Sequence, residues 1–132
     1  CDGCCMYLAR AEFAPRKCVE WSAREEEFVK RAGFVIMARL AVGDKKAGDE
    51  LFEGFLPIIK RESIDQRNYV KKAVNWALRQ IGKRNLALNR TAIETGRDIQ
   101  RMDSRSARWI ASDALRELTG QAVQERLLAK GR

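Results

Sequence analysis

The sequence contains no histidine, only two prolines and no long apolar run among its 132 residues. The absence of histidine removes the side chain most used for proton transfer and metal binding near neutral pH. No apolar stretch approaches the roughly 20 residues that span a bilayer, and no basic start followed by an apolar stretch indicates a secretory signal. We therefore expect a cytoplasmic protein that does not enter a membrane. The scarcity of proline and the long stretches without glycine favour helices over strands.

Basic side chains outnumber acidic ones in this sequence. Lysine and arginine together number 26 against 18 aspartates and glutamates, which gives a formal net charge of +8. Such an excess suggests a polyanionic partner, although charge alone does not separate nucleic acid from a membrane surface. The first residue is not a methionine, and the opening residues resemble the interior of a longer sequence. We expect the chain to be the C-terminal part of a longer domain and to act as a monomer.

All four cysteines lie near the start of the sequence. Cys1 and Cys4 form a C-x-x-C pair, Cys5 follows at once, and Cys18 is a candidate third ligand for zinc. The sequence offers no second C-x-x-C pair, no histidine and no glycine-rich knuckle, features that are typical of structural zinc sites. Free thiols in a reducing compartment fit the pattern better than a zinc site does. We therefore predict neither a metal nor another cofactor.

Apolar residues recur through most of the chain with the period of an amphipathic helix, about 100° per residue. The breaks between periodic segments carry residues that end or begin helices, including Pro15 and Gly43. Asp65 and Ser104 are candidate N-caps, because a side-chain oxygen there can accept a hydrogen bond from the first helical turn. The predicted helices cover residues 2–13, 15–22, 25–42, 47–61, 66–83, 86–101, 104–118 and 121–129.

A short motif repeats along the chain. The segment FVKRA at 28–32 aligns with YVKKA at 69–73, 41 residues later, and both helices continue with apolar residues in the same spacing. A third apolar stripe, which runs over 107–118, follows 37 residues further on. Repeats of helix pairs near 40 residues long are typical of HEAT- and armadillo-like proteins. We therefore predict an all-α fold, a HEAT- or armadillo-like αα-superhelix. Residues 1–132 would form one domain, with repeats at about 1–43, 44–84 and 85–120.

Basic and aromatic side chains share one side of the predicted helix 66–83. Phosphates can take the cations of such a surface, and bases or sugars can cover its rings, so the combination suits a nucleic acid. Exposed rings are otherwise unfavourable in water, which leaves packing between repeats as the alternative for the two aromatic residues. A helical wheel places five such residues opposite the apolar stripe: Lys72, Arg79, Lys83, Trp76 and Tyr69.

Equivalent positions in the neighbouring repeats are also basic. Arg31 in the first copy aligns with Lys72, Lys30 aligns with Lys71, and Arg108 in the third copy aligns with Lys71 again. Stacking the repeats in register would bring these cations together as a ladder along one face, which is the predicted DNA groove. The alternative for any single lysine is an ordinary solvated position.

Two further tryptophans have a simpler interpretation. Trp21 and Trp109 are predicted to be packing residues, because large aromatic side chains contribute most of their stabilisation through burial.

Residues 68–85, NYVKKAVNWALRQIGKRN, contain the pattern K-A-x-x-W-x-L-R-x-x-x-K. This pattern resembles a helix of the DNA alkylation repair enzymes, a family of HEAT-like glycosylases that remove N3- and N7-alkylated purines. Three further segments support the resemblance, namely FVKRAGF at 28–34, the opening Cys1–Asp2 pair, and ARWIASDAL at 107–115. Together they cover nearly the whole chain and correspond to the C-terminal portion of the family's domain.

The resemblance implies roles for three residues. Asp2 is similar to the family's catalytic carboxylate, the last residue of a W-D-x-x-D segment, while Arg31 is similar to its DNA-contacting arginine and Trp76 to its aromatic residue beside the lesion. An N3- or N7-alkylated purine is already cationic, so it can leave the sugar without a general acid or a metal. The implied partner is double-stranded DNA that contains such purines. The other functions considered are a non-catalytic DNA-binding protein of this type and a protein-interaction scaffold.

Overall fold

A computed structural model describes residues 19–43 and 48–130 of the chain, and no strand occurs within these ranges. Residues 19–22 are helical and lead through a short turn into the first complete helix. Each complete helix begins and ends within two residues of its predicted bounds. The prediction of an all-α fold is confirmed. The helices are α3 (Glu27–Gly43), α4 (Asp49–Glu62), α5 (Asn68–Gly82), α6 (Leu86–Gln100), α7 (Arg105–Leu118) and α8 (Gln121–Lys130).

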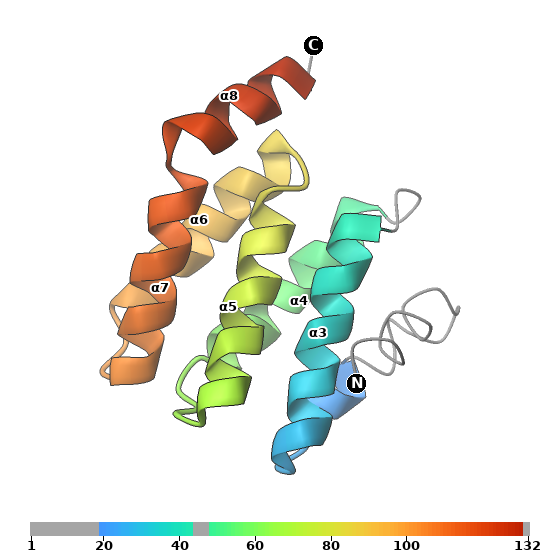
Figure 1. Ribbon diagram of the computed structural model, residues 1–132, viewed down its shortest axis with the longest axis vertical. Helices are drawn as coiled ribbons and strands as arrows, with labels where there is room; N and C mark the ends of the chain where they lie inside the picture. The colour runs from blue at the N-terminus through green and yellow to red at the C-terminus, as the bar shows by residue number, and fades with distance from the viewer. Residues whose placement is uncertain (1–18, 44–47, 131–132) are drawn as a thin grey trace.

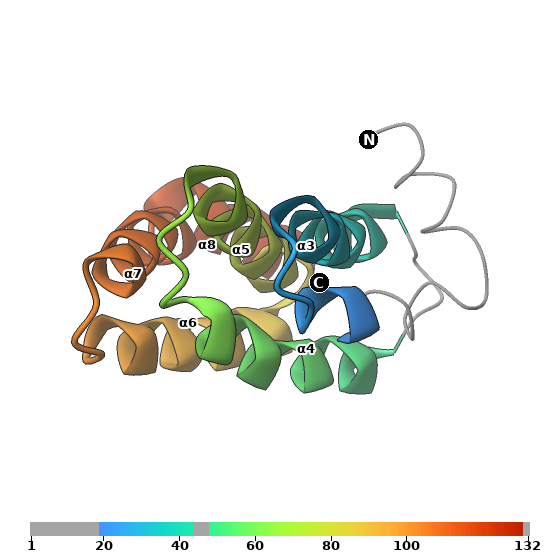
Figure 2. The ribbon, with the colours of Figure 1, turned by 90° about the horizontal axis from the view of Figure 1, so that it is seen from below.

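The helices form two layers. Helices α3, α5 and α7 lie side by side and parallel in one layer, with their first turns at the same end (Figure 1). Helices α4 and α6 lie behind them in the second layer, as the view from below shows (Figure 2). The three aligned stripes of the sequence therefore fall on three equivalent helices, and the predicted packing of helix pairs is confirmed. Helix α8 follows α7 and crosses the end of the stack (Figure 1).

Apolar side chains from both layers form the core between them. Phe34 and Met37 of α3, Phe52 of α4, Leu78 of α5 and Ile110 of α7 are all fully buried. Burial of one such side chain contributes about 1.5–3 kcal/mol to folding. Helix α3 is buried on more than one side, since every residue from 33 to 38 is buried. This agrees with its sequence, because a helix that is apolar around most of its circumference is usually an interior one.

Side-chain caps fix the starts of two helices. The Ser104 hydroxyl accepts a hydrogen bond from the Ala107 amide at 3.2 Å, which confirms the cap predicted for α7. Asn85 caps α6 in the same way through the Leu88 amide. The prediction for Asp65 is wrong, because α5 begins after Arg67 and has no side-chain cap there.

The far ends of α5 and α7 approach each other closely. A Cβ atom added to Gly82 would lie 2.6 Å from Leu118 Cδ2 and 3.1 Å from Ala92 Cβ. Only glycine therefore fits between the layers at this point without a shift of the packing. Beside it, buried Asn89 donates to the Gly82 carbonyl at 2.9 Å and accepts a hydrogen bond from Gln124 at 3.0 Å. These bonds attach α8 to the end of the stack.

Candidate nucleic-acid interface

A cation and an aromatic ring meet where the first turns of α3 and α5 lie together. The guanidinium carbon of Arg31 is 5.6 Å from the centre of the Tyr69 ring. Tyr69 remains 55% exposed, so the alternative that it packs between repeats does not hold. A cation over an exposed ring contributes only about 0.5–1 kcal/mol. The Tyr69 ring is therefore open to a partner that approaches from solvent, and the partly exposed Arg31 lies beside it.

The same arrangement recurs between α5 and α7. The Lys71 ammonium lies 4.8 Å from the centre of the Trp109 ring. Trp109 is 41% exposed, and its interpretation as a packing residue is wrong. It occupies the repeat position of Arg31 and Lys72, which lies on the outer side of its helix. Trp21, in contrast, does pack against the core.

The cations and rings at the first turns of α3, α5 and α7, which are exposed or partly exposed, form one surface that we call the basic edge. Among the residues that the structure describes, no carboxylate pairs with its cations from α3 and α5. Its one cation from α7 has a 3.6 Å contact with Asp103, and both of these side chains are mostly exposed, so the pair is weak. The basic edge consists of Arg31, Tyr69, Lys71, Lys72, Arg108 and Trp109.

The predicted cations near the end of α5 are already paired. Arg79 and Lys83 both bind Glu117 of α7, at 3.0 Å and 2.8 Å, and Arg79 also lies 3.9 Å from Asp113. Burial acts to raise the pKa of Glu117, but the hydrogen bonds from Lys83 and Arg79 outweigh it, so the pKa lies below the usual 4.5. Glu117 is thus ionised at neutral pH and offsets much of this charge. We call these four residues the paired edge.

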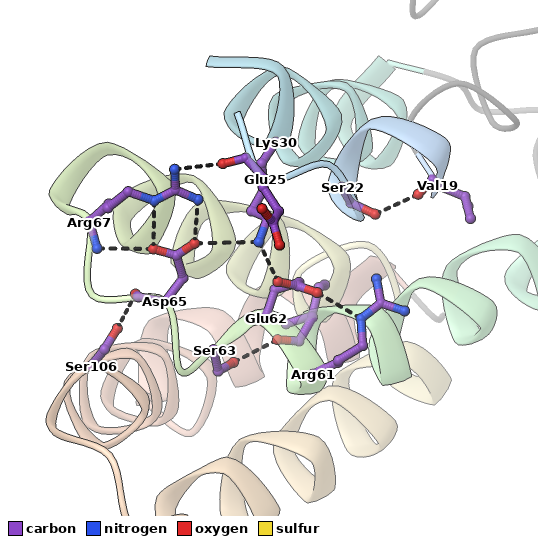
Figure 3. A network of polar contacts seen from close by, with 11 residues as sticks. Val19, Ser22, Glu25, Lys30, Arg61, Glu62, Ser63, Asp65, Arg67 and Ser106 are labelled. Carbon is purple, nitrogen blue, oxygen red and sulfur yellow. Dashed lines mark hydrogen bonds and ion pairs between the residues drawn. The ribbon is translucent and has the colours of Figure 1, made fainter. Parts of the chain in front are cut away.

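Lys30 lies inside the structure and not on the basic edge. Its side chain is only 10% exposed, and its ammonium contacts Glu62 at 2.6 Å and Asp65 at 3.4 Å (Figure 3). A lysine held by two carboxylates has no free charge for a phosphate. The wheel of one helix does not reveal this, because both partners lie more than 30 residues away in the sequence.

Asp65 is the centre of this polar network. Its carboxylate accepts hydrogen bonds from the Arg67 guanidinium, the shortest at 2.7 Å, and its backbone carbonyl accepts one from the Ser106 hydroxyl of α7 (Figure 3). The pKa of Asp65 is lowered from 3.8, chiefly by the Arg67 side chain, against the opposing effect of burial. Arg67 also donates to the Glu25 carbonyl before α3. The network therefore fixes the first turns of α3, α5 and α7, from which the basic edge extends.

Comparison with protein families decides what kind of protein carries this surface. A family model described as DNA alkylation repair enzyme matches residues 1–118. The chain belongs to this family. Comparison with curated proteins and with solved structures gives no match. Membership supports a role in DNA repair, and the resemblance seen in the sequence is confirmed at the level of the family.

Trp76, the aromatic residue that the resemblance places beside the lesion, is half-buried in this member of the family. Trp76 packs against the core. The guanidinium of Arg39 from α3 lies over its ring, with the guanidinium carbon 5.1 Å from the ring centre. Sequence reasoning missed Arg39. A signal was present, because Arg39 is the only charged residue in the otherwise apolar stretch 32–42.

The remaining predictions for this DNA repair protein concern its first residues. Asp2 and the four cysteines lie outside the described residues, so the catalytic role and the zinc or thiol alternatives stay predictions.

Within residues 19–43 and 48–130, no cluster of three or more potential metal ligands occurs. None of the helices in this part of the chain combines the length and the apolar character that crossing a bilayer requires.

Proposed function

We propose that this protein acts in DNA repair as a glycosylase that hydrolyses the N-glycosidic bond of N3- or N7-alkylated purines in double-stranded DNA. The observation that carries the proposal is the basic edge, where cations of neighbouring helices lie beside exposed rings in a member of a DNA alkylation repair family. Cations without carboxylate partners suit phosphates, and rings beside them suit bases or sugars.

The proposed chemistry needs one carboxylate and one aromatic ring. An N3- or N7-alkylated purine carries a positive charge, so its C–N bond can break with the electron pair moving to the base, which leaves neutral. The developing positive charge on the sugar would be stabilised by the Asp2 carboxylate, which would also orient a water molecule. The water oxygen adds to the sugar carbon and its proton passes to solvent. Trp76 would attract the cationic base through its ring face.

Phosphate binding by the basic edge would position the duplex for this reaction. Arg31 can form charge-assisted hydrogen bonds with a phosphate, and Lys72 can act as a point charge beside it. Each phosphate neutralised releases counterions, so the affinity for DNA should fall steeply as salt concentration rises. A protein-interaction scaffold would not show this dependence on salt for a DNA ligand.

The decisive measurement is release of 7-methylguanine or 3-methyladenine from methylated duplex DNA by the full-length protein. We expect release by the parent and almost none by Asp2→Asn, while both proteins bind the duplex equally well. If the variant releases as much base as the parent, the assignment of Asp2 is wrong. If the parent binds DNA in a salt-dependent way but releases no base, the protein is a DNA-binding module and not a glycosylase.

A further inference from the structure

Arg39 approaches Trp76 from the neighbouring helix. The guanidinium carbon lies 5.1 Å from the ring centre, a distance at which the cation interacts with the face of the indole. Trp76 is half-buried and packs against the core, so much of its surface is already covered by protein. The ring face on which Arg39 lies is the surface through which Trp76 could attract another cation.

The guanidinium is not fully satisfied in this position. Nε of Arg39 is buried, and none of the described residues accepts a hydrogen bond from it. Among the same residues no carboxylate forms an ion pair with Arg39, whereas Arg79 on the neighbouring helix has two. A buried donor without an acceptor is unfavourable. The contact with Trp76 is therefore one that Arg39 can give up for a partner that offers charge-assisted hydrogen bonds.

We propose that Arg39 covers the face of Trp76 in the free protein and yields it to the cationic base of a lesion, while its guanidinium moves to a DNA phosphate. This inference rests on the proposed function and adds a specificity-determining residue to it. Two cations cannot share one ring face without repulsion, so entry of the base and departure of Arg39 occur together. An uncharged purine is attracted to the ring more weakly and leaves Arg39 in place.

The first arm of the test measures how far Arg39 covers Trp76 without DNA. A full-length protein in which the other tryptophans are phenylalanine reports on Trp76 alone through quenching of its fluorescence by acrylamide. We expect quenching to increase about twofold in Arg39→Met, which retains an unbranched apolar side chain but loses the cation over the ring. Arg31→Met, which removes a cation from Tyr69 and not from Trp76, is the matched control and should leave quenching unchanged. Equal quenching in the parent and Arg39→Met overturns the proposal.

The second arm measures the salt dependence of binding to two duplexes. One contains 7-methylguanine on a fluorinated sugar that resists hydrolysis, and the other contains guanine at the same place. If Arg39 reaches a phosphate only when the lesion enters, replacing Arg39 by Met lowers the slope of log K against log salt by about 0.9 for the lesion duplex alone. Arg31→Met should lower both slopes alike.

The outcomes separate the two proposals. A parent protein that binds both duplexes equally and releases no methylated base contradicts the proposed function itself. If the parent discriminates between the duplexes but Arg39→Met lowers both slopes equally, or neither, only the role of Arg39 is overturned. Arg39→Lys serves as a check on folding and should restore the lesion-dependent slope, because it returns a cation that can lie on the ring and reach a phosphate.

Discussion

Both ends of the α3–α5–α7 layer carry cations, but the two ends differ in what surrounds those cations. At the basic edge, Arg31 and Lys71 have no carboxylate partner among the described residues, and each lies beside an exposed ring. At the paired edge, Arg79 and Lys83 are both bound to Glu117. The net charge of a helix face therefore does not show how many of its cations are free of carboxylate partners. We expect a cation to contribute to the proposed DNA site only if the neighbouring repeat does not already neutralise it.

The two ends also differ in what holds them together. The end with the basic edge is fixed by a polar network in which Asp65 connects Lys30, Arg67 and Ser106. The end with the paired edge is fixed by close packing of Gly82 against Leu118, and by hydrogen bonds of the buried Asn89 side chain with the Gly82 carbonyl and Gln124. A polar network specifies direction as well as proximity, which suits the proposed role of this surface, in which its cations would match the spacing of DNA phosphates. Each feature of the comparison can be tested separately.

The largest effect should follow from breaking the network. We expect Asp65→Asn to lower the free energy of unfolding by about 2–3 kcal/mol at pH 7, because it removes a mostly buried carboxylate from two cations. The pKa of Asp65 is lowered in the folded protein, so its stabilisation is complete above the unfolded value of 3.8 and is lost as pH falls through the folded value. In urea unfolding measurements, the difference in free energy of unfolding between the parent and Asp65→Asn should therefore become smaller below about pH 4.

The matched control for this change is Asp98→Asn on the other layer. Asp98 contacts Lys60 at 3.6 Å, and both side chains are 47% exposed, so its removal should cost less than about 0.5 kcal/mol. Equal losses for the two variants would show that the network is no stronger than an ordinary surface pair.

The second-largest effect should be on DNA affinity, which we expect to depend strongly on the cations of the basic edge and only weakly on those of the paired edge. We expect Arg31→Ala/Lys72→Ala to weaken binding to duplex DNA about a hundredfold at low salt, and to lower the salt slope by about 1.8, since two phosphate contacts are removed. Arg79→Ala/Lys83→Ala should weaken binding only about threefold, because Glu117 already neutralises much of that charge. Fluorescence anisotropy across a salt series measures both quantities. Similar losses for the two double variants would contradict the distinction between the edges.

The sequence predicted the helices well because the signals for them are local. Apolar periodicity and caps such as Ser104 act within one helix or one turn, so their effect can be read from neighbouring residues. The state of each cation depends instead on long-range pairs. Lys30 is 32 residues from Glu62, and Lys83 is 34 residues from Glu117. Repeat alignment correctly places such residues on equivalent helices but does not identify the side chain that the next repeat places opposite them.

The close packing at the paired edge leaves no room for a larger residue at position 82. Gly82→Ala should lower the free energy of unfolding by about 1–2 kcal/mol, because the added methyl group would overlap the fully buried Leu118 side chain. Gly54→Ala in α4 is the control, since no atom lies within 4 Å of its added Cβ, and it should stabilise the protein by about 0.5–1 kcal/mol. Thermal unfolding measures both changes. We expect DNA affinity to stay unchanged in Gly82→Ala, because the polar network holds the basic edge at the opposite end of the layer.

The smallest expected effect is also the most direct way to erase the difference between the edges. Glu117→Gln removes the charge that neutralises Arg79 and Lys83, so both cations become available to phosphates. We expect duplex affinity to rise about threefold at low salt and the salt slope to steepen by about 1. This is less than two new phosphate contacts would give, because Asp113 remains 3.9 Å from Arg79 and still offsets part of its charge. Glu94→Gln on the exposed side of α6 removes the same charge from the other layer, and should change affinity by less than about 1.5-fold. If the two variants raise affinity equally, total charge governs binding; if only Glu117→Gln does so, pairing across repeats decides which cations can reach DNA.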